Sequence, residues 1–292
     1  MRVLIYRHLK LFLKNPFNIL LSFLSSLVII SLYFLFIRDF TIQAVSDYGF
    51  VSSYNELFVD RLMTSGLLIV VGATSVLSIV FIFVKDYCSG IIKDFMVSPI
   101  SYIKIIYSYF FASFIVSMVI TLLVYLGIQV FFVVVYEDVN SFSTTIFSIF
   151  ILFLSNIISS LLMLIVGLFI RSFTSFSTFE TLYGVVIGFF TGVYIPIGYY
   201  PTLIKNIFFY FPLCQTTSLL RNIQTSVIVD KILDSYPKSQ HDILYNTFGV
   251  HLTFCDVAIS LKDQLVIVIV AIILLNFIVL FIIYLRRYHK IH

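Results

Sequence analysis

Charged side chains are scarce in this sequence: Asp, Glu, Lys and Arg make up 11% of its 292 residues, against about 25% in soluble domains. Hydrophobic residues make up 61%, which excludes a soluble enzyme and a nucleic-acid-binding protein. The three cysteines, Cys88, Cys214 and Cys255, are too few for an extracellular disulfide scaffold and lack the spacing of a metal site, although Cys214 and Cys255 could pair. Tryptophan is absent, so tyrosine must supply the polar-tipped anchors at a membrane interface. A polytopic membrane protein remains.

Long apolar runs predict an all-α polytopic membrane protein with six transmembrane helices, because a helix needs roughly 20 apolar residues to cross the hydrocarbon layer. Five runs contain no charged residue: Phe17–Phe36, Met63–Val84, Ile105–Val135, Phe147–Ile170 and Val266–Leu285. The predicted fifth span, Phe179–Tyr199, contains Glu180 and is interrupted near its end by Pro196. We expect residues 1–292 to form a single transmembrane domain.

The distribution of charge predicts the orientation. The segments 1–16, 85–104, 171–178 and 286–292 contain two acids, Asp86 and Asp94, and eleven basic residues: Arg2, Arg7, Lys10, Lys14, Lys85, Lys93, Lys104, Arg171, Arg286, Arg287 and Lys290. The opposite side contains seven basic and eleven acidic residues. Because short basic loops stay in the cytoplasm, both termini are predicted to be cytoplasmic. We expect no cleavable signal peptide before the first span.

Residues 1–16 predict an interfacial helix that precedes the first span. Three cations share one helical face and three apolar side chains lie opposite: Arg7, Lys10 and Lys14 against Ile5, Leu9 and Phe12. We expect the cations to meet lipid phosphates and the apolar face to enter the acyl boundary. Pro16 would mark the turn into the first span. The alternative is a frayed, positively charged tail.

Two loops are long enough to do more than reverse the chain. The segment 85–104 predicts a short amphipathic helix that lies on the membrane or fits the groove of a partner. Its apolar residues at helical spacing are Ile91, Ile92, Phe95 and Met96. The external segment 195–262 contains an apolar run, 203–211, which is too short to cross and predicts re-entrant helices packed against protein. From Asn222 onward we expect a polar external cap.

The motifs of these two segments resemble those of the type-2 ABC exporter permeases. Between the second and third spans, an acid, a glycine four residues later and a Ser-Pro-apolar-Ser ending carry the likeness: Asp86, Gly90 and Ser98-Pro99-Ile100-Ser101. The second part of the signature comprises Gly192, Ile195-Pro196, Pro201, Phe211-Pro212 and Leu220-Arg221. Ile91 departs from the family, which commonly has threonine there, and the polar tail of the external segment is unusually long. Length and composition resemble those of the permeases of streptococcal haemolysin and pigment exporters.

The resemblance implies a permease domain in the plasma membrane of a bacterium, paired with a second permease copy in a homodimer or related heterodimer and driven by cytoplasmic ABC ATPase subunits. Residues implied in coupling to the ATPase are Asp86, Gly90, Phe95, Ser98 and Pro99; those implied in an outer gate are Ile195, Pro196, Pro201 and Pro212. No glycine in the sequence is followed by lysine, so the chain lacks a phosphate-binding loop. We therefore expect ATP and magnesium on the partner ATPase, no cofactor in this chain, and contacts with membrane lipid but not with nucleic acid.

Small and polar residues within the spans are candidates for a translocation path, because the second and fifth helices of the family line it. These candidates are Gly72, Ser75, Ser78, Glu180 and Tyr183. Gly72, Ser75 and Ser78 form a stripe of small residues at three-residue steps on the second span. This stripe fits helix packing equally well. Glu180 is the only ionisable side chain inside a span and could lie at the cytoplasmic mouth of the path. Alternatively, Glu180 pairs with Arg171 at the membrane interface.

Other small and polar residues of the spans are expected to pack helices together. Gly184, Gly188 and Gly192 form two G-x-x-x-G steps, which predict a close packing face on the fifth span. Polar residues expected to form hydrogen bonds between helices are Asn156, Ser159, Ser160 and Asn276. The five histidines are scattered without metal spacing, so no hydrolytic or metal site is predicted.

The sequence therefore predicts a transport subunit that is not an enzyme by itself and that needs a separate ATPase. We expect it to export an amphipathic or lipid-like compound, such as a drug, a toxin or a natural product, by alternating access. An exporter of cell-surface glycopolymers would share these motifs. An integral-membrane enzyme would need His and acidic residues clustered at one membrane depth, and a structural scaffold would not need the surface helix around Gly90.

Overall fold

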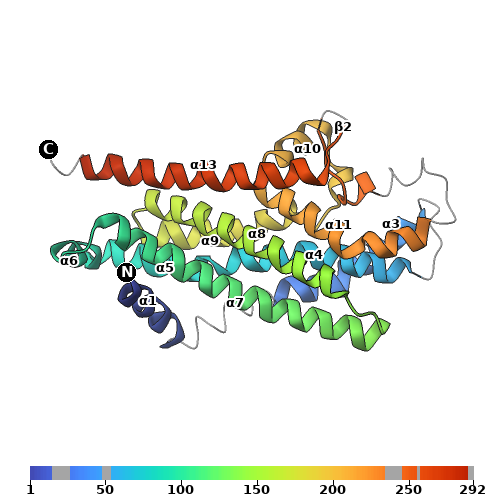
Figure 1. Cartoon of the computed structure of the whole chain (residues 1–292), viewed down its shortest axis with the longest axis horizontal. Helices are drawn as coiled ribbons and strands as arrows, with labels where there is room; N and C mark the ends of the chain where they lie inside the picture. The colour runs from blue at the N-terminus through green and yellow to red at the C-terminus, as the bar shows by residue number, and fades with distance from the viewer. Residues whose placement is uncertain (15–26, 48–53, 234–244, 255–256, 289–292) are drawn as a thin grey trace.

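The computed structural model describes residues 1–14, 27–47, 54–233, 245–254 and 257–288, which form an elongated bundle of helices (Figure 1). In chain order the first elements are α1 (Arg2–Lys14), the π-helical turn η1 (Tyr33–Ile37), α3 (Arg38–Asp47), α4 (Asn55–Ser75), α5 (Leu77–Cys88), α6 (Ile91–Val97) and α7 (Tyr102–Tyr136). They are followed by α8 (Phe142–Phe169), α9 (Phe173–Phe190), the 3-10 turn η2 (Ile197–Tyr199), α10 (Thr202–Phe209), α11 (Pro212–Leu233), β1 (Thr253–Phe254), β2 (Val257–Ala258) and α13 (Leu261–Tyr288). Helices α1 and α6 and the last turns of α13 lie at one end of the bundle, the α6 end; α3 lies at the other, the α3 end.

Five helices are long and apolar enough to cross a membrane: Leu27–Asp47, Asn55–Cys88, Tyr102–Tyr136, Phe142–Phe169 and Leu261–Arg286. The last four match the predicted second, third, fourth and sixth spans, which confirms that these segments are helical. Of the predicted first span, residues 17–26 lie outside the described residues. The described part of this helix continues beyond the predicted end at Phe36 to Asp47.

The predicted fifth span, Phe179–Tyr199, is wrong at both ends. Helix α9 begins at Phe173 and ends at Phe190, and it is not one of the five helices above. Gly192 adopts a left-handed backbone conformation with φ +65°, and Pro196, which has no amide hydrogen to continue a helix, immediately precedes η2. Residues 191–199 therefore form turns and one short 3-10 helix instead of the end of a span.

Local sequence explains where several helices begin and end. Ser141 precedes α8, and its hydroxyl accepts a hydrogen bond from the amide of Thr144 at 3.1 Å, as expected of a helix N-cap. Helix α6 ends before Ser98, which is extended because a residue that precedes proline disfavours the helical conformation. Pro201 directly precedes α10 and Pro212 is the first residue of α11, the positions at which proline costs a helix no hydrogen bond.

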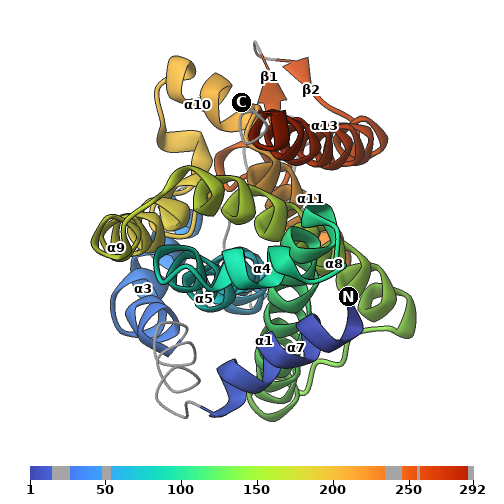
Figure 2. The same ribbon diagram turned by 90° about the vertical axis from the view of Figure 1, so that its left-hand side faces the viewer.

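Helix α4 lies at the centre of the bundle and is buried along almost its whole length (Figure 2). It packs against α7, α8, α9 and α11, which explains why its sequence is apolar on all sides. Helix α11 also packs against α8 and α13. The polar external cap predicted from Asn222 onward is therefore wrong for α11, because Gln224 and Thr225 are buried inside the bundle. The strands β1 and β2 form a small antiparallel pair.

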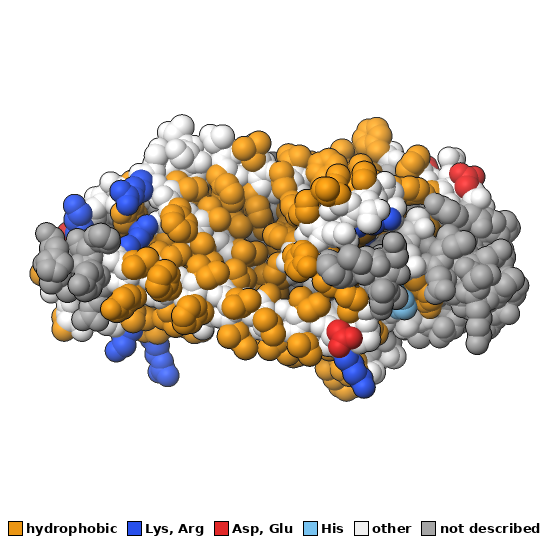
Figure 3. Space-filling view, turned by 90° about the horizontal axis from the view of Figure 1, so that it is seen from above, with side chains coloured by type: hydrophobic (Ala, Val, Ile, Leu, Met, Phe, Trp, Pro, Cys, Tyr) orange, Lys and Arg blue, Asp and Glu red, His pale blue; other side chains and the backbone are white. Residues whose placement is uncertain are grey.

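The surface of the bundle is largely apolar. Figure 3 shows hydrophobic side chains over most of the visible middle of the molecule, with Lys and Arg side chains gathered at its α6 end. Long exposed hydrophobic series lie on α7 and α13, where only part of each helix is covered by neighbours. Such a continuous apolar surface would be unfavourable in water and fits contact with lipid.

Candidate functional site

Helix α6 forms a small projection at one end of the bundle. Gly90, which joins it to α5, has φ +82°, and no atom lies within 4 Å of the position that a Cβ would take. Only glycine adopts this conformation at little cost, so Gly90 allows the turn between α5 and α6. On α6 itself Ile92 is buried, whereas Lys93 and Asp94 are exposed and Val97 is 89% exposed. The helix therefore presents most of its surface outward.

The other residues predicted to couple to an ATPase lie around this helix. Phe95 is partly buried, and its carbonyl oxygen accepts a hydrogen bond from the Ser98 hydroxyl at 2.5 Å. Pro99 is exposed just beyond the helix. The structure thus brings Asp86, Gly90, Phe95, Ser98 and Pro99 together in one region, and their contact with an ATPase stays a prediction.

Asp86, in the last turn of α5, is buried and is bound from two other helices. Arg7 of α1 donates to Asp86 from Nη1 to Oδ2 at 2.6 Å and from Nη2 to Oδ1 at 3.3 Å. Tyr109 of α7 donates its hydroxyl to Oδ2 at 2.7 Å. Burial opposes the charge of Arg7, but its hydrogen bond to Asp86 and the charge of that carboxylate raise the pKa of Arg7 above its ordinary value. The guanidinium of Arg7 also lies 5.0 Å from the ring centroid of Phe95, so one side chain joins α1, α5 and α6.

Sequence reasoning identified Asp86 but missed both of its partners. Arg7 is 79 positions away along the chain and Tyr109 is 23 positions away, so no local spacing relates them. Two features of the sequence pointed toward this contact. Asp86 follows an apolar run, and residues 1–16 were predicted to form a basic helix on the same side of the membrane.

Helix α1 is present as predicted, but its predicted apolar face packs against other helices of the same chain. Leu4 and Phe12 are buried against α5 and α7. Of the three cations, Arg7 faces Asp86, whereas Lys10 and Lys14 are exposed. The prediction that this helix lies on the membrane through its apolar face is therefore corrected, because that face is used for packing within the chain.

His8 lies inside this packing. Its ring stacks on Tyr109 with 3.8 Å between ring centroids, and Nε2 lies 3.0 Å from the hydroxyl of Ser108. Burial and, second, the positive charge of Arg7 lower the pKa of His8 to about 4. The imidazole is therefore neutral at physiological pH. The His8 side chain is fully buried.

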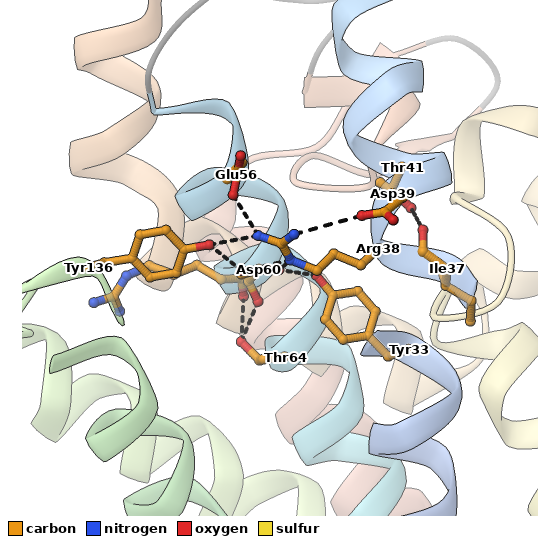
Figure 4. Close-up of polar contacts among 10 residues, drawn as sticks. Tyr33, Ile37, Arg38, Asp39, Thr41, Glu56, Asp60, Thr64 and Tyr136 are labelled. Carbon is orange, nitrogen blue, oxygen red and sulfur yellow. Dashed lines mark hydrogen bonds and ion pairs between the residues drawn. The ribbon is translucent and has the colours of Figure 1, made fainter. Parts of the chain in front are cut away.

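A second buried acid, Asp60, lies on α4 toward the α3 end (Figure 4). It accepts hydrogen bonds from the hydroxyl of Tyr33, from Arg38 Nε at 3.0 Å and from the hydroxyl of Tyr136 at 2.5 Å. Arg38 also donates to Glu56 at 2.7 Å. We call these five residues the Asp60 cluster; they join helix Leu27–Asp47 and α7 to the central helix α4.

Arg61 and Arg221 are almost fully buried nearby. Arg61 donates to Asp138 at 2.9 Å and to Gln224 of α11 at 2.8 Å. Arg221 donates to three backbone carbonyl groups, at distances of 2.9–3.2 Å: those of Leu62, Gly192 and Phe248. A buried charge is tolerated only when it is hydrogen-bonded, and these bonds connect α11 to α4 and to two turns. Sequence reasoning noted Arg221 as a motif residue and missed Arg61 and the Asp60 cluster.

The predicted path residues on α4 and α5 make contacts within one chain. A Cβ at Gly72 would lie 2.6 Å from Asn156 Oδ1 on α8 and 3.1 Å from Thr121 Oγ1 on α7. Ser75 donates to the carbonyl of Val71 at 2.7 Å, and Ser78 donates to the carbonyl of Ser75 at 2.8 Å. These contacts favour helix packing for the stripe, and its role in a path stays a prediction.

Glu180 and Tyr183 lie on α9, and both are partly buried. The alternative of an ion pair between Glu180 and Arg171 is not realised, since the ion pairs within the described ranges do not include it. The hydroxyl of Tyr183 is buried and has no hydrogen-bond partner in the described structure. A function of these two residues in transport stays a prediction.

The three glycines predicted to form one packing face do not share a helix. Gly184 faces open space, whereas a Cβ at Gly188 would lie 2.2 Å from the ring of Tyr194. Gly192 follows the end of α9 and packs against Ile197. The prediction of one continuous face is therefore corrected, because the helix ends before the third glycine.

The predicted outer-gate residues lie around the turns that flank α10. Pro196 is buried, Pro212 is partly buried, Pro201 is exposed, and Ile195 is 38% exposed. Each proline lies just before or at the beginning of a helix. Their arrangement explains the turns, and a gating role stays a prediction.

The polar residues expected to join helices divide into two groups. Asn276 of α13 accepts a hydrogen bond from the hydroxyl of Tyr107 on α7, which confirms that prediction. Asn156 donates to the carbonyl of Leu152 on its own helix and, at 3.6 Å, to the sulfur of Met118 on α7, which confirms the prediction for Asn156. The prediction is wrong for Ser159, which donates to the carbonyl of Ser155 on its own helix.

The remaining predictions concern Ser160, metal ligands and the cysteines. The hydroxyl of Ser160 is buried without a hydrogen-bond partner in the described structure, so the predicted hydrogen bond from Ser160 to another helix is wrong. Groups of three or more His, Cys, Asp and Glu residues that could hold a metal ion are not found within the described ranges. Cys214 is buried, and Cys255 lies outside the described residues.

Comparison with known proteins gives the family. The family model described as ABC-2 type transporter matches residues 1–225, which extends from α1 into α11. No curated protein matches the chain. The match covers well over half of the sequence and includes α6, Gly90, Asp86 and the central helix. The chain therefore belongs to the ABC-2 type transporter family.

Proposed function

We propose that this ABC transporter permease exports its cargo and that α6 is the surface on which a separate cytoplasmic ATPase subunit docks. The observation that carries the proposal is α6 itself, an exposed helix whose base is held by the buried Asp86. Val97, at 89% exposure, is an apolar side chain that a partner's groove would cover. ATP and magnesium would be bound by that partner.

Movement of α6 would reach the centre of the bundle by a short route. Helices α5 and α4 together form the long helix Asn55–Cys88, which is the most buried of the five described helices that could cross a membrane. Arg7 adds α1 to the same unit through its ion pair with Asp86 at 2.6 Å. A displacement of α6 during the ATPase cycle would therefore shift α1, α5 and α4 together, as needed for rigid-body alternating access.

The α6 end would face the cytoplasm, and α9 would complete six crossings. Eleven basic residues occur in the segments assigned to that side, in agreement with the positive-inside rule. Helix α1 and the last turns of α13 both lie at the α6 end, and an even number of crossings is needed to return the chain there. At 18 residues, α9 is about 27 Å long, close to the thickness of the hydrocarbon layer.

The export of an amphipathic or lipid-like cargo by a dimer of permease subunits is the corresponding proposal for transport. It is supported by the resemblance of the coupling segment to exporter permeases, among which the haemolysin and pigment exporters are similar in length and composition. Arg61 and Arg221 are engaged by hydrogen bonds inside the fold, which leaves the described interior with little free charge for a strongly ionic cargo.

The docking surface can be tested by co-purification of the tagged chain with its ATPase subunit. Val97→Asp should abolish retention of the ATPase, because it places a charge in the apolar contact. Val139→Asp is the matched control, since Val139 is 72% exposed and lies between α7 and α8, away from α6. Equal ATPase retention by both variants, or a wild-type chain that purifies without an ATPase, would overturn the proposal.

A further inference from the structure

An apolar groove of about 390 Å³ lies between helix Leu27–Asp47, α4 and α7. Its volume is within the range of small-molecule sites. Its lining is almost entirely apolar and includes Leu27, Ile30, Phe34, Leu67, Ile128 and Phe131. Gly127 also lines it, and no atom lies within 4 Å of the position of a Cβ there, so the groove is open beside this residue.

One end of the groove meets the Asp60 cluster. Each of the three helices contributes a groove residue and, four or five positions away along the chain, a cluster residue: Phe34 and Arg38, Thr64 and Asp60, Phe131 and Tyr136. Thr64 donates its hydroxyl to the carbonyl of Asp60 at 2.6 Å. The ring of Phe131 lies 5.2 Å from that of Phe34 and 6.1 Å from that of Tyr136. The site is therefore amphipathic, with an apolar length and a polar end.

The polar end carries excess negative charge. Residues 37–62 and 136–146 contain six carboxylates and two arginines, Arg38 and Arg61, a net charge of −4. This equals the whole acidic excess of the side of the sequence predicted to be external. Arg61 pairs with Asp138. Arg38 is shared by Asp39, Glu56 and Asp60, so one positive charge faces three carboxylates, and the side chains of Asp39 and Glu56 are exposed. The potential at this end should attract a cation.

We propose that this groove binds a single-chain amphiphile with a cationic head group, its alkyl chain between the three helices and its head beside Glu56. The inference rests on the proposed function and identifies cationic amphiphiles as a substrate class of the exporter. Membrane lipid is itself apolar, so transfer of an alkyl chain from lipid into the groove releases little hydrophobic free energy. Selection must therefore come mainly from the head group, through charge.

The experiment uses the purified chain in phosphatidylcholine nanodiscs and two photoreactive probes. Both probes carry the same diazirine-labelled dodecyl chain, one ending in trimethylammonium and the other in sulfonate. Peptides labelled after illumination are identified by mass spectrometry. The ammonium probe should label the groove walls, residues 27–40, 60–70 and 122–136, about fivefold or more above the sulfonate probe, as expected from one nearby uncompensated carboxylate.

Two variants separate the groove from its charge. Gly127→Phe fills the open groove and should lower labelling of its walls by about tenfold. Gly184→Phe is its control, since Gly184 also faces open space but lies on α9, outside the groove lining, and should label like the wild type. Glu56→Gln keeps an acceptor for Arg38 and should reduce the preference for the ammonium probe, whereas Asp94→Asn at the α6 end should not.

Equal labelling by the two probes would overturn the inference, as would labelling that Gly127→Phe leaves unchanged. Crosslinking of two copies through a cysteine introduced at position 127 would also overturn it, because the groove would then be an interface between permeases. The outcome is distinct from that of the proposed function: the nanodiscs contain no ATPase, so loss of ATPase co-purification would refute docking at α6 without changing the labelling.

Discussion

The ion pair between Arg7 and Asp86 should contribute strongly to stability. Two unit charges about 4 Å apart interact by about 4 kcal/mol at an effective dielectric constant of 20. Removal of one member of a buried pair costs about 3–5 kcal/mol, because the other charge is left uncompensated. Arg7 is 29% exposed, and Tyr109 would still donate to Asp86 in the variant. We therefore expect Arg7→Met to lower the free energy of unfolding by about 3 kcal/mol, the lower end of this range.

The assay is a double-mutant cycle in mixed micelles, with the free energy of unfolding measured by titration with SDS. Asp86→Asn keeps an acceptor for Tyr109 but removes the charge, so it should offset most of the cost of Arg7→Met. The expected coupling energy is about 2–3 kcal/mol. Lys10→Met, an exposed change on the same helix, should cost less than about 0.5 kcal/mol. Additivity of the two changes within about 0.5 kcal/mol would refute the reasoning.

Three further predictions concern buried residues elsewhere in the fold. Burial lowers the pKa of His8 from 6.5 to about 4, so the free energy of unfolding should decrease as pH falls from 6.5 toward 4, by up to about 1.4 kcal/mol per pH unit. His8→Gln should remove this pH dependence. An unchanged pH dependence in the variant would contradict the assignment to His8. Gly72→Ala should destabilise the fold by about 1–3 kcal/mol, because the added methyl group is overpacked against Asn156. Gly184→Ala should be neutral or stabilising, because no atom lies within 4 Å of the added Cβ. The melting temperatures of the two variants test this difference. Arg221→Met should cost about 2–4 kcal/mol because three carbonyl groups lose their donor, and thermal stability equal to that of the wild type would show that these hydrogen bonds contribute little.

Long apolar runs were sufficient to locate four of the membrane-capable helices, because twenty consecutive apolar residues are a local property of the chain. The turn at Gly90 and the end of α6 at Ser98-Pro99 were also predictable, since backbone preferences of glycine and of the residue before proline act within a few residues. The fifth span was predicted poorly because its hydropathy continues past Phe190, while Gly192 and Pro196 end the helix.

The shortage of charge by itself determined that this chain is a helical membrane protein, and the position of the few charges predicted its orientation. Only the tertiary structure decided what those charges do. Asp86 meets Arg7 across 79 positions, and Asp60 meets Tyr136 across 76. A charge removed from water must find a partner or a hydrogen bond, and that partner is chosen by the packing of helices remote in sequence. The apolar groove beside the Asp60 cluster also depends on the tertiary structure, because each of its three walls belongs to a different helix.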